Sequence, residues 1–158
     1  MTAPPPPDRT PLLGLRPPFA ALLLLGLAAL VDWATGSPPV VPWPWRWAGV
    51  LPLAAGAVVA VAALLCFHAH RTTHNPFGLP TALVTTGPYR FSRNPMYVGL
   101  VACLLGVGVL RGTWPFLAVA PVLFVVLRAA FVPYEEARME RLFGAEYVAW
   151  KARTRRWL

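Results

Sequence analysis

The sequence predicts an all-α, polytopic integral membrane protein with about four transmembrane helices. Three observations support this: an apolar composition, four apolar runs and a one-sided distribution of positive charge. Hydrophobic residues make up 57% of the 158 residues, charged residues make up 13%, and the mean hydropathy is +0.56. A soluble domain carries roughly 45–50% apolar and about 25% charged residues. A soluble domain of this size could not bury so much apolar surface. The composition also excludes a wholly disordered chain.

The four apolar runs lie at about residues 19–34, 47–67, 95–110 and 113–132. A spanning helix needs about 20 apolar residues, with a range of roughly 17–25. The second and fourth runs meet this length, whereas the first and third are short and would stand nearly upright or thin the bilayer. Only Arg111-Gly112 separates the last two runs. This short connection predicts a tight antiparallel helical hairpin.

The segments outside the runs have their own composition. Residues 1–17 are Pro-rich and predict a flexible tail, and the Pro- and Trp-containing loop 36–46 predicts a rigid interfacial connection. A cleaved signal peptide is an alternative interpretation of the first run, although the charged region before it is long and Pro-rich. Beyond the fourth run, mixed charged and aromatic residues predict an amphipathic C-terminal helix on the cytosolic headgroups.

Positive charge predicts the orientation in the membrane. Twelve of the 14 Lys and Arg residues lie in the N-terminal tail, in the loop 68–94 or in the segment from Arg128 onward, and only Arg46 and Arg111 lie on the other side. With four spans, this places both termini in the cytoplasm, and a bacterial inner membrane is the expected location. In a membrane protein, a net charge of +8 serves topology and anionic headgroups, so we expect no nucleic-acid partner.

The polar segment before the third run is the first candidate for chemistry. Asn94 and Pro95 predict the N-cap and the first position of a helix. The free N–H groups and positive dipole end of such a helix suit a carboxylate, and Arg90 and Arg93 add positive charge nearby. As a cap, Asn94 could be replaced by Asp without loss of stability. Gly99 would allow a neighbouring helix or a flat ligand to approach closely. The alternative is a capped helix with arginines that only set topology.

The second candidate is the pair Glu135-Glu136 at the end of the fourth run. Two adjacent carboxylates are costly to bury, because like charges repel and lose hydration. Either both face water, or at least one binds a cationic ligand or pairs with Arg90 or Arg93. No Cys or carboxylate accompanies the loop histidines, so no metal site is predicted there.

A family resemblance rests on elements at matching spacing: the segment 83–99, the pair Glu135-Glu136, and the residues Phe143, Gly144 and Tyr147. Together these resemble the isoprenylcysteine carboxyl methyltransferase-like family of integral membrane methyltransferases, to which phospholipid methyltransferases are related. The resemblance implies that residues 1–158 form a single membrane methyltransferase domain whose cofactor-binding part is 67–158. It also implies S-adenosylmethionine as methyl donor and in-line transfer to a lipophilic acceptor, either a carboxylate, a thiol or an amine.

Carried over by position, the resemblance implies cofactor contacts at His74, Leu83, Val84, Tyr89, Asn94, Pro95, Met96, Tyr97, Glu135 and Glu136. It identifies no catalytic residue, for which Arg90 and Arg93 are the candidates. Asn94 stands where eukaryotic members have His, and Phe131 stands where they place an Arg for the prenylcysteine carboxylate. A prenylcysteine acceptor is therefore not implied. Chemically, Glu135 suits the cationic side of S-adenosylmethionine, and the tyrosines can offer aromatic faces.

Two other classes fit parts of the pattern. A sterol-reductase-like NADPH enzyme shares a similar C-terminal motif, but those proteins are much longer. A non-catalytic four-helix membrane protein, with a role in transport or interaction, is the alternative from another class. A small drug exporter would need a carboxylate in the middle of its first span, and Asp32 lies near the end of that run.

Overall fold

The structure, a computed structural model, describes residues 16–69 and 81–158, and within these ranges it contains helices and no strand. The α-helices are α1 (Pro17–Thr35), α2 (Val50–Ala69), α3 (Pro95–Arg111), α4 (Trp114–Val126) and α5 (Val132–Arg153). Two 3₁₀ segments, η1 (Trp45–Gly49) and η2 (Gly87–Arg90), and one π-helical segment, η3 (Leu127–Phe131), complete the described elements. The predicted all-α class is confirmed.

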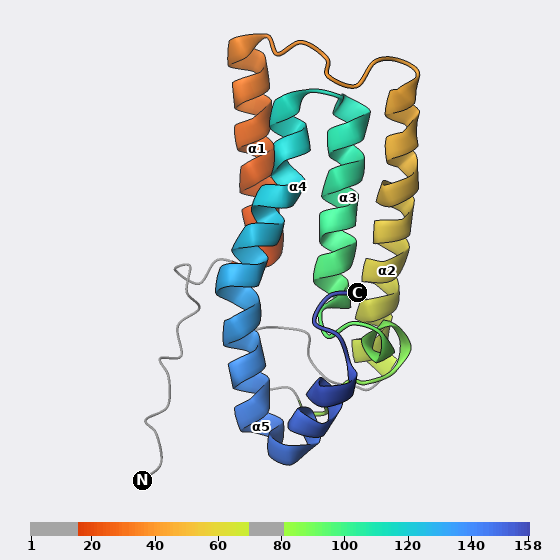
Figure 1. Cartoon of the computed structure of the whole chain (residues 1–158), viewed down its shortest axis with the longest axis vertical. Helices are drawn as coiled ribbons and strands as arrows, with labels where there is room; N and C mark the ends of the chain where they lie inside the picture. Colours follow the sequence, from red (N-terminus) through yellow and green to blue (C-terminus); the bar gives the residue numbers. More distant parts are fainter. Residues whose placement is uncertain (1–15, 70–80) are drawn as a thin grey trace.

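The helices stand side by side in the order α1, α4, α3, α2 (Figure 1). The connections α1–α2 and α3–α4 lie at the upper end in that view, and η2, the start of α3 and the C-terminal residues lie at the lower end. The α3–α4 hairpin turns at Gly112, whose positive φ of 74° lets its N–H donate to the Gly108 carbonyl. The two polar segments singled out in the sequence therefore meet at one end of the bundle.

Three helices are long and apolar enough to cross a membrane, judged by length and composition: Pro17–Thr35, Trp45–Ala69 and Trp114–Arg153. The helix α3 is apolar but has 17 residues, and it stands between α2 and α4 (Figure 1). Large apolar side chains such as Leu22 and Leu51 are 62% and 76% exposed. Such an outward-facing apolar surface is what contact with lipid requires, and the chain is an integral membrane protein.

Small residues bring α2 and α3 into close contact. A Cβ atom added to Gly99 would lie 2.6 Å from the carbonyl oxygen of Gly56. A second close approach lies about two turns further along α3. There a Cβ on Gly106 would lie 2.6 Å from the carbonyl oxygen of Gly49, the last residue of η1 before α2. Of the two partners predicted for Gly99, a helix or a flat ligand, the structure shows a helix. This contact fixes the start of α3 relative to α2.

The predicted C-terminal helix is present as α5, but it is not a separate element. The fourth span passes through η3 directly into α5. The π turn lies just before Pro133, which has no N–H to continue the α-helical ladder. At Gly144, φ is 52° and ψ is −126°, and the remaining part of α5 turns back toward the start of α3 (Figure 1). Trp150, on this returning part, is consequently buried.

Candidate functional site

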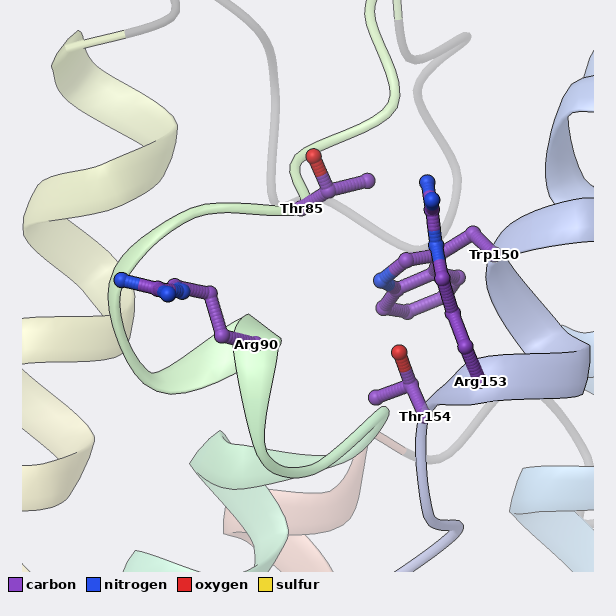
Figure 2. A pocket seen from close by; sticks show the side chains of 5 residues that line it. All are labelled: Thr85, Arg90, Trp150, Arg153 and Thr154. Atoms are coloured by element: carbon purple, nitrogen blue, oxygen red, sulfur yellow. The ribbon is translucent and has the colours of Figure 1, made fainter.

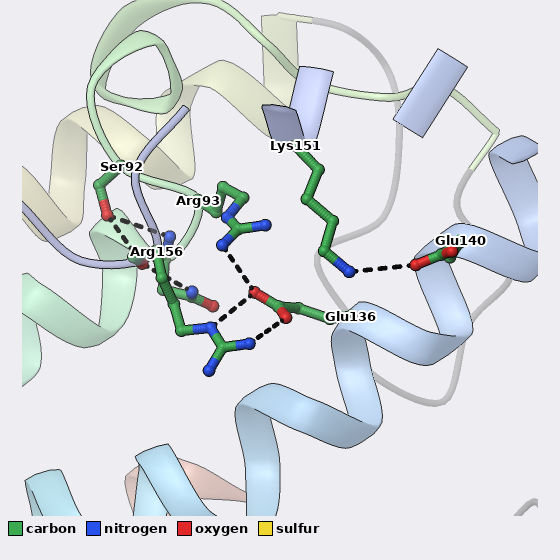
Figure 3. Close-up of polar contacts among 7 residues, drawn as sticks. Ser92, Arg93, Glu136, Glu140, Lys151 and Arg156 are labelled. Carbon is green, nitrogen blue, oxygen red and sulfur yellow. Dashed lines mark hydrogen bonds and ion pairs between the residues drawn. The ribbon is translucent and has the colours of Figure 1, made fainter. Parts of the chain in front are cut away.

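Glu136 lies at the centre of a charged cluster at the lower end of the bundle. Its carboxylate accepts hydrogen bonds from Arg156 Nε at 3.1 Å and from Arg156 Nη2 at 2.7 Å (Figure 3). Arg93 Nη2 lies 3.4 Å from the same carboxylate. Glu136 itself is only 7% exposed. The predicted pairing of one carboxylate with Arg93 is thus observed, and we call these three residues the Glu136 clasp.

The clasp ties the C-terminal strap, residues 154–158, to the segment before α3. The N–H of Arg93 donates to the Arg155 carbonyl at 2.8 Å, and the Asn94 side-chain amide donates to the Arg156 carbonyl at 2.9 Å. Trp157 packs against Phe124, with ring centroids 4.8 Å apart. The strap therefore lies across the start of α3.

This arrangement corrects the predicted role of the Asn94 side chain. Asn94 occupies the N-cap position and Pro95 begins the helix, as predicted, but the Asn94 side chain forms no capping hydrogen bond. Its amide is instead directed to the strap, because the carbonyl of Arg156 offers an acceptor there. The helix start faces the strap, and neither Asn94 nor Pro95 lines the cavity described below.

Glu135 differs from its neighbour in its partners. The Tyr97 hydroxyl donates to Glu135 Oε1 at 2.5 Å. Among the described residues Glu135 forms no ion pair, and the positive charge of Arg138 acts on it. Of the two adjacent carboxylates, Glu136 is neutralised by arginines, whereas Glu135 has the Tyr97 hydroxyl as its hydrogen-bond partner.

An apolar cluster lies beside these carboxylates. It buries Val84, Tyr89 and Trp150, and Leu83 and Met96 pack against it. Four predicted cofactor contacts, Leu83, Val84, Tyr89 and Met96, thereby come together with Trp150, which was not predicted. Burial raises the pKa of the Tyr89 phenol, and the nearby Cys66 and Glu135 raise it further. Tyr89 is therefore a neutral aromatic face close to the Glu135 carboxylate.

A cavity of about 350 Å³ opens between η2 and the end of α5 (Figure 2). Its lining residues are Thr85, Arg90, Trp150, Arg153 and Thr154. Its volume lies at the lower end of the range of small-molecule pockets, about 300–1,000 Å³. Arg90 is the one predicted site residue in this lining. The other four were not predicted from the sequence, and the glycine inside the α5 pattern, Gly144, was the available signal that the chain returns.

Nine of the twelve predicted site residues fall into three groups. Leu83, Val84, Tyr89 and Met96 share the apolar cluster, Tyr97 and Glu135 share a hydrogen bond, and Asn94, Arg93 and Glu136 hold the strap. His74 lies outside the described residues, as do residues 1–15 of the predicted tail. One end of the bundle thus combines a carboxylate for a cation, aromatic faces, and arginines for an oxyanion.

Comparison with protein-family models identifies the chain. The phospholipid methyltransferase family matches residues 45–146, more than half of the sequence. This range runs from η1 into α5 and includes both polar segments, but it ends before Trp150 and the strap. Searches of curated proteins and of solved structures each gave no significant match. The chain therefore belongs to the phospholipid methyltransferase family and is an integral membrane methyltransferase.

Proposed function

We propose that the protein transfers the methyl group of S-adenosylmethionine to a lipophilic acceptor that enters from the bilayer. The observation that carries this proposal is the Glu135 carboxylate beside a cluster of aromatic and apolar residues. This carboxylate forms no ion pair with any described residue. The family of the chain supports methyl transfer as the reaction. The acceptor is a lipid or lipid-linked molecule with a carboxylate, thiol or amine as its nucleophile.

The residues present fit S-adenosylmethionine. This molecule carries a sulfonium and an ammonium cation, for which Glu135 is the available carboxylate. Tyr89 and Tyr97 offer aromatic faces, which attract cations through the ring quadrupole. Leu83, Val84 and Met96 supply apolar surface for the less polar parts of the cofactor. In this proposal Asn94 and Glu136 are positioning residues, because their side chains hold the strap.

The work of the protein in such a reaction is mainly positioning. S-adenosylmethionine supplies an electrophilic methyl group when bound, and the acceptor atom must be in line with it. Alignment and exclusion of water can lower the barrier without an acid or base residue. Glu135 orients the cation, and the hydrogen bond from Tyr97 holds the Glu135 carboxylate in place. Burial of Val84 and Tyr89 keeps this region dry.

The proposal also includes an orientation, with both termini and the site in the cytoplasm. Twelve of the 14 Lys and Arg residues lie in the N-terminal tail, in the loop 68–94 or in the segment from Arg128 onward, on one side of the predicted spans. The positive-inside rule then assigns that side to the cytoplasm. A reporter fused to Leu158 should be active in the cytoplasm. Activity only outside it would overturn the orientation and the supply of a cytosolic cofactor.

The proposal is tested by calorimetric titration of the detergent-purified protein with S-adenosylmethionine. We expect Glu135→Gln to weaken binding by about 2–5 kcal/mol, as for loss of a partly desolvated charged partner. Glu140→Gln is the matched control, because Glu140 pairs with Lys151 at 3.1 Å on an exposed surface. It should change binding by less than about 1 kcal/mol. Equal losses in the two variants, or a parent that does not bind, would refute the proposed site.

A further inference from the structure

The cavity between η2 and α5 contains donors that the proposed cofactor site does not use. Of its five lining residues, only Arg90 appeared among the predicted site residues, and none of the five is assigned to the cofactor. We propose that this cavity is an oxyanion site that binds a phosphate group. This inference goes beyond the proposed function and does not depend on it.

The cavity contains an unsatisfied donor. The buried indole N–H of Trp150 has no hydrogen-bond partner among the described residues, and Trp150 is only 5% exposed. Figure 2 shows the nitrogen-bearing edge of the ring facing the space between Arg90 and Thr154. A buried N–H without an acceptor is unfavourable, so an oxygen atom of a ligand would stabilise this arrangement.

The lining of the cavity also carries positive charge. Arg153 extends beside the Trp150 ring, and the Thr154 hydroxyl points into the same space (Figure 2). Arg90 forms the opposite wall, where its side chain extends away from Trp150. Within residues 16–69 and 81–158 neither arginine forms an ion pair, and no carboxylate lines the cavity. The lining therefore combines positive charge with N–H and O–H donors.

These properties favour a phosphate over the cationic parts of the cofactor. The positive charge of this lining would repel a sulfonium or an ammonium, which the Glu135 carboxylate attracts. A phosphate has several acceptor oxygens and can be bound from different sides by an indole, a hydroxyl and a guanidinium. The volume of about 350 Å³ exceeds that of one ion and leaves room for the molecule that carries it. A lipid headgroup and a soluble phosphate share this chemistry.

The experiment titrates the full-length protein in a phosphate-free detergent with three probes. These are inorganic phosphate, dihexanoyl phosphatidic acid below its micelle concentration, and dihexanoylglycerol, which lacks the phosphate. Binding of either phosphate probe, with none of dihexanoylglycerol, is the expected result. A lower Kd for the phosphatidic acid than for inorganic phosphate assigns the site to a lipid headgroup, and the reverse order assigns it to a soluble phosphate.

Three variants test the location. Trp150→Phe keeps the aromatic packing and removes only the N–H, so it should raise the Kd of the phosphate probe about tenfold. Arg153→Gln should raise it at least as much. Arg155→Gln is the matched control. It removes the same charge two residues further along the chain, and the Arg155 side chain does not line the cavity. Its Kd should stay within about twofold of the parent, because the Arg155 side chain lies outside the cavity.

Two results would overturn the inference. One is a parent that binds neither phosphate probe, and the other is an unchanged Kd for phosphate in both Trp150→Phe and Arg153→Gln. A parallel titration with S-adenosylmethionine keeps the two proposals apart. Loss of cofactor affinity in Trp150→Phe with phosphate binding intact would assign the cavity to the cofactor and also overturn the inference. Phosphate binding in a parent that does not bind S-adenosylmethionine would sink the proposed function alone.

Discussion

The contribution of one buried carboxylate can be worked out from the Glu136 clasp. Glu136→Gln keeps the size of the side chain and removes its negative charge. The carboxylate accepts two hydrogen bonds from Arg156 and lies 3.4 Å from Arg93. A single substitution therefore removes the counter-charge of two arginines.

The magnitude depends on how far each arginine can return to water. The Arg93 side chain is 11% exposed, and its buried Nε and Nη1 have no hydrogen-bond partner in the part of the chain that the structure describes. Removing one partner of a buried pair costs about 3–5 kcal/mol. The Arg156 side chain is 41% exposed and can be rehydrated. Loss of its pairing should therefore lower the free energy of unfolding by about 0–1 kcal/mol, as for a surface pair. We expect Glu136→Gln to lower the free energy of unfolding by about 3 kcal/mol, the lower end for a buried pair.

Chemical unfolding in mixed micelles measures this loss, with Arg156→Gln as the matched variant. Arg156→Gln should cost only about 1 kcal/mol, because Glu136 then keeps Arg93 as its partner. Equal losses in the two variants would show that Arg93 does not depend on the carboxylate. A loss under about 0.5 kcal/mol in Glu136→Gln would refute the reasoning from burial, since it is typical of exposed pairs.

Three further substitutions have distinct expected outcomes. Gly99→Ala would place a Cβ 2.6 Å from a backbone oxygen of α2 and should lower the free energy of unfolding by about 1–3 kcal/mol. Gly26→Ala is its control, because the added Cβ meets no atom within 4 Å and should leave the free energy of unfolding unchanged in the same assay. Gly144→Ala also has open space, so its expected loss of about 1–3 kcal/mol comes from the positive φ alone; an unchanged melting temperature would contradict this. Asn94→Asp places an acceptor against the Arg156 carbonyl and should lower the free energy of unfolding by about 1–3 kcal/mol. A variant as stable as the parent would instead support the side-chain cap predicted from the sequence.

The helices could be predicted from the sequence because polar residues, Gly or Pro clearly separate the apolar runs. Their order in the bundle could not. The runs are apolar on all sides, so no amphipathic face indicates which helix contacts which. Gly99 was recognised as a point of close approach, but its partner Gly56 has the same appearance as any glycine in an apolar run. Neighbouring helices in lipid are selected by such small-residue fits, which a pattern of hydrophobicity does not record.

The site was predicted where local chemistry carries the information. The Glu135-Glu136 pair and the aromatic residues around Asn94 stand out from their surroundings, and the structure brings most of them together. The strap and the cavity were missed because they depend on contacts distant in sequence. Arg156 resembles any other basic residue of the C-terminal segment, and only the reversal at Gly144 makes it a partner of Glu136.

The strap has a consequence for how the protein is made. Asn94 and the Arg156 carbonyl that it contacts are 62 residues apart, and the whole α3–α4 hairpin lies between them. During synthesis the apolar helices leave the ribosome and can enter the bilayer before residues 154–158 exist. Biogenesis therefore has two stages, in which insertion comes first and closure of the strap comes last. A chain interrupted shortly after α4 would insert normally and still lack the clasp, so the amount of protein in the membrane would not report how much of it is competent.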